Sequence, residues 1–479
     1  MALVPLLLAL ENQSVRRTFA YAWLQGSAFY VVTLYWVELM LRRFGQKTPT
    51  AAVFEMLLLG GFEGLAMAVT LMLAAFAGRR TRVPMLVTLT IAWPAIEWLR
   101  TFFPFPFPWA FTGYTAYRDL RLIQFSEFTG VYGVSALIVA ANVAAYQLIF
   151  GSQALRARLR DSAIVIGMIF AALVFGSLRI SQLDRAPAAG KLKVAMVQGN
   201  ILESAKWDPA EVVSRFKVYV DESEAAALQH PDLIIWPETA ANFYIAPDRF
   251  FKNREQLLRL ARDIRIPLLV GTMAVHSGRE DTIFNRACLI SAEGQVVANY
   301  DKNMLVAFAE YLPLKSVFGN YFHAFSDKTS ADYMPGDRQT IFNVSGTRFA
   351  VLICYESLFP DLARRAVKAG AEILINIEND AWSDRSAQPY QSLAMASMRA
   401  VETHTPMVRV NNTGISAVIT PVGRITDATA LFVRTTEIET VEWKNVRTFY
   451  TRRGDVFAKI CFGLGMVLLL AACLRGGAA

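Results

Sequence analysis

The chain has 479 residues, enough for two or three domains, and 54% of them are hydrophobic. Its mean hydropathy of +0.33 excludes an ordinary soluble protein and predicts a membrane protein. The formal net charge of +8 would suit nucleic-acid binding, but the arginines cluster beside apolar stretches and no recognition motif appears, so we expect no nucleic-acid partner.

Candidate membrane spans fill the first part of the chain and recur near its end. A helix needs about 20 residues to cross a bilayer. The candidates are residues 20–40, 51–76, 84–99, 131–150, 163–178 and 459–474, of which the third and fifth are short. Residues 1–10 are apolar but too short to span. A secretory signal peptide is the rival interpretation, but no small-residue cleavage site follows Leu10.

The arginines between these stretches predict an orientation. Three groups fall on one side of the membrane if every span crosses it, namely Arg16 and Arg17, Arg79 to Arg82, and Arg156 to Arg160. The positive-inside rule assigns that side to the cytoplasm, although the loop 42–47 carries positive charge on the other side. The long segment after Leu178 then lies outside the cytoplasm, which in a Gram-negative cell means the periplasm.

Residues 191–446 have a different pattern, in which short apolar runs end in polar residues. The runs are 192–199, 232–238, 267–272, 285–291, 296–302, 349–356, 373–380 and 407–412, with helical patterns at 209–229 and 359–369. Strands that alternate with helices predict an α/β domain. We therefore expect a helical transmembrane domain at 1–182, a catalytic domain at 190–446 and a transmembrane helix at 457–475.

Three of the runs deliver reactive side chains where they end. Glu238 follows residues 232–236, Lys302 follows 296–301, and Cys354 follows 349–353. A lone cysteine on an apolar strand is most often a core residue, and a nucleophilic thiol needs a nearby base or positive charge. The four cysteines show no metal-ligand spacing and no dense framework, so we expect neither a zinc site nor a disulfide scaffold: Cys288, Cys354, Cys461 and Cys473.

These residues carry a resemblance to a known family. The sequences WPE at 236–238, YDKNMLV at 300–306 and ICYE at 353–356 resemble the Glu-Lys-Cys triad of the nitrilase, or carbon-nitrogen hydrolase, superfamily. More narrowly, VQGN at 197–200 with Trp207, AEYLP at 309–313 and NDAW at 379–382 resemble the apolipoprotein N-acyltransferase branch. The runs at 97–100, 107–114 and 130–134 resemble the membrane domain of that branch.

The resemblance implies a four-layer αββα sandwich and a role for each site residue. Glu238 would be the general base, Lys302 would stabilise the oxyanion, and Cys354 would be the nucleophile. The supporting residues would be Glu310, Tyr355 and Glu356, and Trp207 would contact substrate. In the alternative interpretation Glu310 and Glu356 are exposed loop acids. The roles require no cofactor and no metal.

Some positions depart from the family's pattern. Ala307 and Ala309 stand in the loop before Glu310, where proline and glycine are usual, and Ser383 stands where an aromatic residue is usual. Residues 388–392, which end in Ser392, replace a Gly-Pro and a Gln-His pair. The first span and part of the second of the family's usual set are missing. These changes bear on acceptor recognition more than on the triad.

The resemblance implies an inner-membrane enzyme whose catalytic domain is periplasmic. It would move a fatty acyl chain from a phospholipid to the α-amino group of a diacylglyceryl-modified apolipoprotein, through a cysteine thioester, and act as a monomer. A membrane-tethered amidase or nitrilase acting on a small amide or nitrile is the first alternative. A catalytically inactive sandwich that serves as a binding module is the second. The intact triad argues against the binding module, and the membrane domain argues against the hydrolase.

Overall fold

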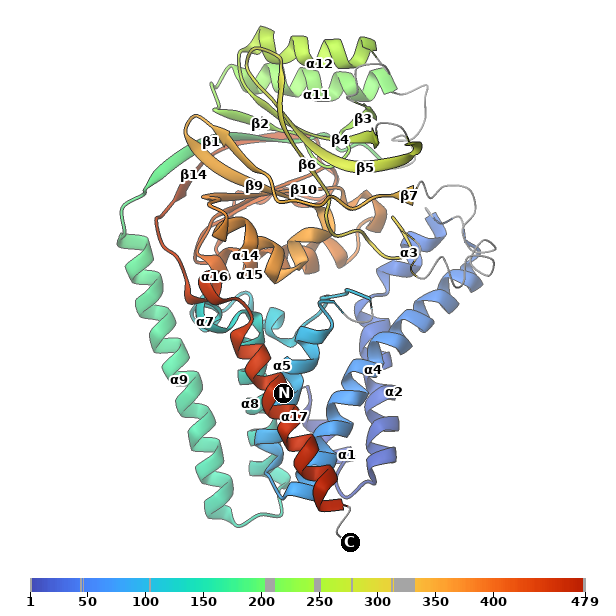
Figure 1. Cartoon of the computed structure of the whole chain (residues 1–479), viewed down its shortest axis with the longest axis vertical. Coiled ribbons are helices and arrows are strands. Elements are labelled where there is room, and N and C mark those ends of the chain that lie inside the picture. The colour runs from blue at the N-terminus through green and yellow to red at the C-terminus, as the bar shows by residue number, and fades with distance from the viewer. Residues whose placement is uncertain are drawn as a thin grey trace. The chain divides into compact units, whose positions relative to one another are not determined.

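The computed structural model describes residues 2–43, 45, 47–102, 105–202, 212–244, 251–276, 279–311, 313 and 332–476. The chain divides into two compact units (Figure 1). One is helical and comprises Met1–Arg185, Ser386–Glu402 and Thr448–Ala479. The other is an α/β unit and comprises Ala186–Arg385 and Thr403–Arg447. The segment Ser386–Glu402 therefore belongs to the helical unit, although it lies inside the expected catalytic domain in sequence.

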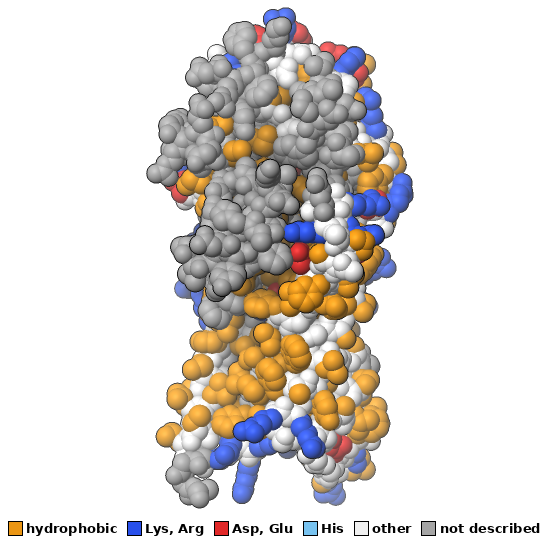
Figure 2. Space-filling model, turned by 90° about the vertical axis from the view of Figure 1, so that its right-hand side faces the viewer, with side chains coloured by type: hydrophobic (Ala, Val, Ile, Leu, Met, Phe, Trp, Pro, Cys, Tyr) orange, Lys and Arg blue, Asp and Glu red, His pale blue; other side chains and the backbone are white. Residues whose placement is uncertain are grey.

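The helical unit is built from helices that differ widely in length. They are α1 Val4–Ala9, α2 Val15–Thr33, α3 Trp36–Arg43, α4 Pro49–Thr81, α5 Met85–Leu99, η1 Thr112–Ala116, α6 Leu120–Ile123, α7 Ser126–Thr129, α8 Val131–Phe150, α9 Leu155–Arg185, α15 Gln388–Thr403, α16 Phe449–Arg453 and α17 Val456–Gly476. Within the described residues, four helices are long and apolar enough to cross a membrane: α4, α8, α9 and α17. Figure 2 shows the hydrophobic side chains that cover this unit as a band.

Two expected spans have a different form in the structure. The stretch 20–40 is divided into α2 and α3, which meet at an angle of 57° and pass the test for a span together. The stretch 163–178 is the middle of α9, a helix of 31 residues. The break before α3 coincides with polar contacts, because the Trp36 Nε1 donates to Gln391 of α15 at 3.1 Å and the Tyr35 hydroxyl accepts from the Ala387 N–H at 3.0 Å.

The α/β unit contains two sheets. The larger has the order β14-β1-β2-β4-β5-β6, with β3 paired to β4 and β7 to β5. Its strands are β14 Thr435–Trp443, β1 Gly190–Gln198, β2 Leu233–Ile235, β4 Leu268–His276, β5 Arg279–Ile290, β6 Val296–Asp301, β3 Ala241–Tyr244 and β7 Asp332–Tyr333. The smaller sheet has the order β13-β12-β11-β10-β9-β8. Its strands are β13 Ile425–Thr426, β12 Ala417–Ile419, β11 Met407–Asn411, β10 Ile373–Glu378, β9 Thr347–Ile353 and β8 Ile341–Val344.

The sheets pack face to face, and helices cover their outer faces (Figure 1). Alternate residues of the central strands form the core between the sheets, such as Val194 and Met196 from β1 with Val351 and Ile353 from β9. Helices α11 Val212–Ala227 and α12 Phe251–Ile264 pack on the outer face of the larger sheet. Helix α14 Pro360–Lys368 follows β9 on the smaller sheet. This is the layered arrangement expected for a nitrilase-like domain.

The direction of the strands brings the residues that follow them to common edges of the sheets. Strands β1, β2 and β4 run parallel, as do β9, β10 and β11, so their carboxyl ends lie at common sheet edges. Strand β2 and the second half of β9 are continuous apolar runs because both faces are buried, whereas β10 and β11 also carry the buried polar residues Asn376 and Arg409. Where such a run leaves the core, polar side chains follow.

Candidate active site

Cys354 lies at the sharp turn that follows β9. The strand ends at Ile353, and the 3-10 helix η3, Cys354–Leu358, begins at once. Cys354 has a φ of 53°, a conformation that few residues other than glycine adopt. Strained backbone of this kind persists where the surrounding structure holds it, and it is common at functional sites. The thiol is partly exposed, whereas Cys288 is buried.

Glu238 and Lys302 reach the same place from the larger sheet. The Lys302 Nζ lies 3.6 Å from a Glu238 carboxylate oxygen and 2.7 Å from Oε1 of Glu310. Lys302 is 1% exposed, so its ammonium is taken out of water almost completely. Burial lowers the pKa of Lys302, but the charges of Glu310, Cys354 and Glu238 together raise it well above its ordinary value. The lysine therefore stays protonated.

Asn285 connects the two carboxylates and was not predicted from the sequence. Its Nδ2 donates to Oε1 of Glu238 at 2.7 Å and lies 3.5 Å from Oε1 of Glu310. The backbone carbonyl of Asn285 accepts a hydrogen bond from the backbone N–H of Lys302 at 2.9 Å. The signal available was an asparagine at the start of the apolar run 285–291, within strand β5. Such a residue needs buried hydrogen-bond partners.

The turn that carries Glu238 is held against strand β4. A Cβ atom at Gly271 of β4 would lie 2.2 Å from the Pro237 carbonyl oxygen and 2.7 Å from the Glu238 Cα. Only glycine allows this approach. On the other side of β2, the Trp236 Nε1 donates to the Ser223 hydroxyl of α11 at 2.9 Å. The backbone that presents Glu238 is therefore fixed from both neighbouring elements.

Glu310 and Glu356 are hydrogen-bonded and do not project into solvent. Glu310 accepts from Lys302 and, through Oε2, from the Val306 N–H at 2.8 Å, which closes its own loop. Glu356 is fully buried, and its Oε1 accepts from the Tyr300 hydroxyl at 2.8 Å and from the N–H of Asn303 at 2.6 Å. Both carboxylates thus hold the backbone that follows Lys302, and Glu356 also holds the Tyr300 side chain before it.

The remaining predicted residues have different surroundings. Tyr355 is buried and packs edge-on against Phe359, with ring centroids 5.1 Å apart. Trp207 lies outside the described residues.

Electrostatics set the state of the thiol. Burial and the charge of Glu238 raise the pKa of Cys354 well above its ordinary value, while Lys302 lowers it. The resting enzyme therefore holds a thiol rather than a thiolate at neutral pH. Such a thiol becomes nucleophilic only when a base takes its proton, and a carboxylate beside it can do so.

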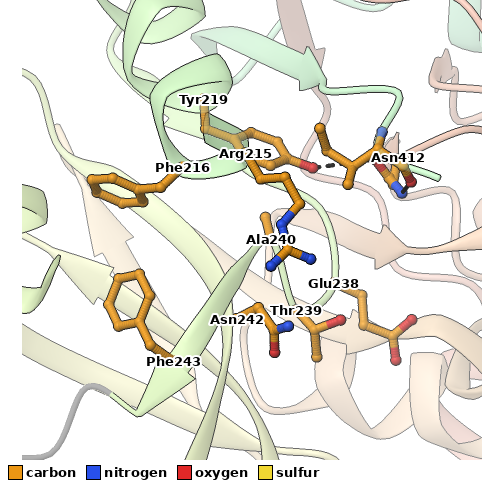
Figure 3. Close-up of a pocket in the computed structure, with 10 residues that line it drawn as sticks. Arg215, Phe216, Tyr219, Glu238, Thr239, Ala240, Asn242, Phe243 and Asn412 are labelled. Carbon is orange, nitrogen blue, oxygen red and sulfur yellow. Dashed lines mark hydrogen bonds between the residues drawn. The ribbon is translucent and has the colours of Figure 1, made fainter. Parts of the chain in front are cut away.

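A pocket opens beside Glu238 (Figure 3). It has about 370 Å³ of space, part of it open to solvent, and it is lined by Arg215, Tyr219, Glu238, Asn242 and Asn412 among others. Figure 3 shows the Arg215 guanidinium pointing into it from α11. Asn412 closes one wall, because its Oδ1 accepts from the Tyr219 hydroxyl at 3.2 Å.

Comparison with known proteins places this geometry in a family. The family model for carbon-nitrogen hydrolases matches residues 193–470, and that for the apolipoprotein N-acyltransferase N-terminal domain matches residues 1–144. An apolipoprotein N-acyltransferase of Geobacter metallireducens is 34% identical over 98% of this chain and 90% of its own length. The chain belongs to the apolipoprotein N-acyltransferase family.

Other relatives agree with this assignment. The apolipoprotein N-acyltransferase of Azotobacter vinelandii is 30% identical over 91% of this chain and 83% of its own length. Among solved structures, a variant of the Nesterenkonia AN1 amidase from the nitrilase superfamily is 19% identical, with a TM-score of 0.44, over 58% of this chain and 99% of that one. The family models and the curated relatives confirm the expected family and its nitrilase-like domain. The protein is an enzyme of the N-acyltransferase family, which acts at membranes.

Proposed function

We propose that the protein transfers a fatty acyl chain from a membrane phospholipid to the α-amino group of a diacylglyceryl-modified apolipoprotein. One observation carries the proposal. The buried ammonium of Lys302 lies between the carboxylates of Glu238 and Glu310, and its charge lowers the pKa of the Cys354 thiol. A positive charge fixed beside a nucleophile stabilises an oxyanion that forms there.

In the first half-reaction Glu238 takes the proton of the Cys354 thiol as the sulfur attacks the carbonyl carbon of a phospholipid ester. A carbon–sulfur bond forms, and the carbonyl oxygen becomes an oxyanion facing Lys302. The ester carbon–oxygen bond then breaks. The proton passes from Glu238 to the leaving oxygen, so the products are a lysophospholipid and a Cys354 thioester.

In the second half-reaction the amine of the apolipoprotein attacks the thioester. Glu238 accepts a proton from the amine and returns it to the Cys354 sulfur as the carbon–sulfur bond breaks. Because an α-amino group is largely protonated at neutral pH, with a pKa of about 7.7–8.0, one further proton is released to solvent per turnover. Glu310 and Glu356 position Lys302 and its loop, and Trp207 contacts substrate. The sequence of steps uses no cofactor and no metal.

Mass spectrometry of the purified protein tests the mechanism. With phospholipid alone, the protein should gain the mass of one acyl chain on Cys354, removable by hydroxylamine. Cys354→Ala and Glu238→Gln should both lack the adduct. Cys473→Ser, which changes an exposed cysteine, is the matched control and should keep it.

Addition of a diacylated lipopeptide should then discharge the adduct and yield a triacylated peptide. If no phospholipid gives an adduct while small amides release ammonia, the protein is a hydrolase. If it does neither, a binding module becomes the better interpretation.

We also propose an orientation in the bacterial inner membrane, with residues 190–446 as a periplasmic catalytic domain and residues 1–182 and 457–475 in the membrane. Arg79 of α4 donates to the Gln13 carbonyl, and Arg475 of α17 donates to the Thr81 carbonyl at 3.0 Å. These contacts gather arginines at one end of the helical unit, where Figure 2 also shows Lys and Arg side chains below the hydrophobic band. The positive-inside rule supports a cytoplasmic location for that end.

A reporter fused after Asp184 tests the orientation. A reporter enzyme that is active only in the periplasm should be active when it is fused at this position. Activity of a cytoplasm-only reporter at the same position would overturn it. The oligomeric state is a separate question, and we propose a monomer because one chain supplies every site residue.

A further inference from the structure

A fourth carboxyl group lies beside the proposed nucleophile and has no part in the mechanism above. Glu378 is the last residue of β10, and β10 pairs in parallel with β9 so that Ile377 lies opposite Ile353. Glu378 is therefore next to the position of Cys354 across the two strands, which lie about 4.8 Å apart. It is 3% exposed.

The main partner of Glu378 is a buried arginine that it shares. Arg409, on the neighbouring strand β11, forms an ion pair with Glu378. Its guanidinium also lies 3.2 Å from Oδ2 of Asp380, and its side chain is completely buried. Asp380 has a further donor, because Asn411 Nδ2 donates to the same oxygen at 2.6 Å. Two carboxyl groups thus face one guanidinium.

Full ionisation of this cluster would leave one negative charge uncompensated. An uncompensated buried charge costs several kcal/mol, so a proton is retained where it is easiest to hold. Glu378 is that place, since Asp380 has two donors. Consistently, burial raises the pKa of Glu378 to about 8, although Arg409 opposes the change.

The cluster is physically connected to the nucleophile. Asn376, two residues before Glu378, accepts from Arg409 at 2.8 Å and donates to the Leu352 carbonyl at 3.0 Å and the Cys354 carbonyl at 3.4 Å. Negative charge on Glu378 raises the pKa of the Cys354 thiol, after burial and Glu238, and Cys354 in turn raises the pKa of Arg409. The protonation state of Glu378 therefore enters the energy of the thiolate.

We propose that Glu378 is a positioning residue of the acylation step. As a neutral carboxyl group Glu378 leaves its cluster with Arg409 and Asp380 without net charge, whereas as a carboxylate it adds one uncompensated negative charge that opposes the Cys354 thiolate. The proposal rests on the proposed role of Cys354 as nucleophile. The charged groups that face Glu378 are Arg409 from β11, Asp380 from η4, Asp380–Ser383, and Glu238 from the turn after β2.

The sign of the pH dependence follows. Below about pH 8 Glu378 is neutral, and the reactivity of Cys354 should rise with pH as the thiol loses its proton. Above about pH 8 Glu378 ionises, and the rise should become shallower because the new charge opposes the thiolate. The remaining charges that act on the thiol, on Glu238, Lys302 and Glu310, are present in every variant considered below.

The test is the rate of alkylation of Cys354 by iodoacetamide from pH 6 to 9.5. The full chain in detergent is used, and the modified cysteine is located by peptide mass. Glu378→Gln keeps an oxygen for Arg409 but cannot ionise. At pH 6.5 the two proteins should react within about twofold of each other, whereas at pH 9 the variant should react roughly tenfold faster, the effect of one pKa unit.

A second variant moves the effect the other way. Asp380→Asn leaves Arg409 to Glu378 alone, so Glu378 should ionise more readily and the change of slope should move below pH 8. Curves for Glu378→Gln and the parent that are parallel at every pH would overturn the proposal, since a purely structural role scales all rates alike. If Glu378→Gln does not fold, an unchanged profile for Asp380→Asn overturns it equally.

The same assay separates this proposal from the proposed function. Alkylation reports the thiol of Cys354 whether or not phospholipid acylates it. The predicted pH profiles without any acyl adduct would contradict acyl transfer but would leave intact the effect of Glu378 on the reactivity of the Cys354 thiol. An acyl adduct together with parallel pH profiles would support acyl transfer and contradict the role of Glu378.

Discussion

The two units bury charged side chains in different ways. In the helical unit three buried carboxylates each face one arginine: Glu63 with Arg100 at 2.8 Å, Glu127 with Arg179 at 2.7 Å, and Glu402 with Arg399 at 2.9 Å. In the α/β unit two buried cations each face two carboxyl groups, Lys302 with Glu238 and Glu310, and Arg409 with Glu378 and Asp380.

In the proposed mechanism, Lys302 and the two carboxylates that share it perform the chemistry. A one-to-one pair carries no net charge when both partners are ionised. A cation shared by two carboxylates leaves one acid undercompensated, as at Glu378, whose pKa burial raises to about 8. Perturbed acids of this kind cluster at functional sites. The imbalance in the α/β unit lies around Cys354.

The largest effect is expected from removal of the shared lysine. Lys302→Met keeps the length of the side chain but leaves Glu238 and Glu310 buried without a cation and the oxyanion without its partner. We expect the rate of acyl-adduct formation on Cys354 to fall by about 10⁴-fold, the scale for loss of one member of a catalytic triad. Single-turnover mass spectrometry measures it.

The control for this variant is the unfolding temperature in detergent, which shows whether the fold survives. A well-folded Lys302→Met protein that acylates within tenfold of the parent would show that the imbalance around Cys354 is not catalytic.

A large effect on stability, without a specific effect on chemistry, is expected in the helical unit. Arg100 also donates to the carbonyls of Phe107 and Trp109, each at 3.2 Å, so it fixes the segment after α5. Arg100→Leu should lower the free energy of unfolding by about 3–5 kcal/mol, because Glu63 is left buried and unpaired. Thermal unfolding in detergent measures the loss.

The matched double variant is Glu63→Gln with Arg100→Leu. It should recover part of the stability, because no charge remains uncompensated. If the double variant is less stable than Arg100→Leu alone, the pair does not behave as a neutral structural unit.

A smaller, pH-dependent effect is expected from Glu356, which is held by hydrogen bonds. Burial raises its pKa to about 7 from the ordinary 4.5. The folded protein therefore binds a proton that the unfolded chain releases in this range, so the stability due to this group is present at pH 4.5 and is lost as the pH rises through 7.

The variant Glu356→Gln has no titratable group at this position, so comparison with the parent isolates the pH-dependent stability due to Glu356. The stability of the parent relative to the variant should decrease from pH 5 to pH 8, because other carboxyl groups titrate in both proteins and cancel. Chemical unfolding at several pH values measures the difference. A constant difference would show that Glu356 has the same protonation state in both folded and unfolded chains.

The strand ends of the catalytic site were predictable from the sequence for a physical reason. Buried parallel strands must be continuous apolar runs, and polar side chains appear where the runs leave the core. Strands β2 and β9 are such runs and end at Ile235 and Ile353, just before Glu238 and Cys354. Lys302 follows Asp301 at the end of β6, which is antiparallel to β5 and largely exposed. The local pattern therefore predicted where in the fold these three side chains lie, while their catalytic roles remain a proposal.

Residues that depend on distant partners were not predictable in this way. Asn285 lies inside a strand and its partner Glu238 is 47 residues away, while Arg409 and Asn376 are 33 residues apart. The bend between α2 and α3 coincides with a contact between Tyr35 and Ala387, 352 residues apart. No local pattern reports such pairs, because an asparagine or an arginine within a strand is interpreted only once its buried partners are known.

The smallest effect is expected from an ion pair at the surface. It tests whether the separation of the charges or their burial sets how much an ion pair contributes to the free energy of unfolding. Lys217 and Asp221, on α11, form a pair at 2.6 Å, shorter than the 2.8 Å between Arg100 and Glu63. Their side chains are 69% and 42% exposed, against 10% and 5% for Arg100 and Glu63. Water and salt screen the exposed pair, so Lys217→Ala should change the free energy of unfolding by only about 0.3–0.5 kcal/mol.

Thermal unfolding of Lys217→Ala and Arg100→Leu at low and high salt compares the two pairs. The small effect should vanish in 1 M salt, where the screening length is about 3 Å, while the loss in Arg100→Leu should persist. A loss at Lys217 as large as that at Arg100 would mean that separation, rather than exclusion of water, sets the value of these pairs, and the contrast between the two units would have to be explained by geometry alone.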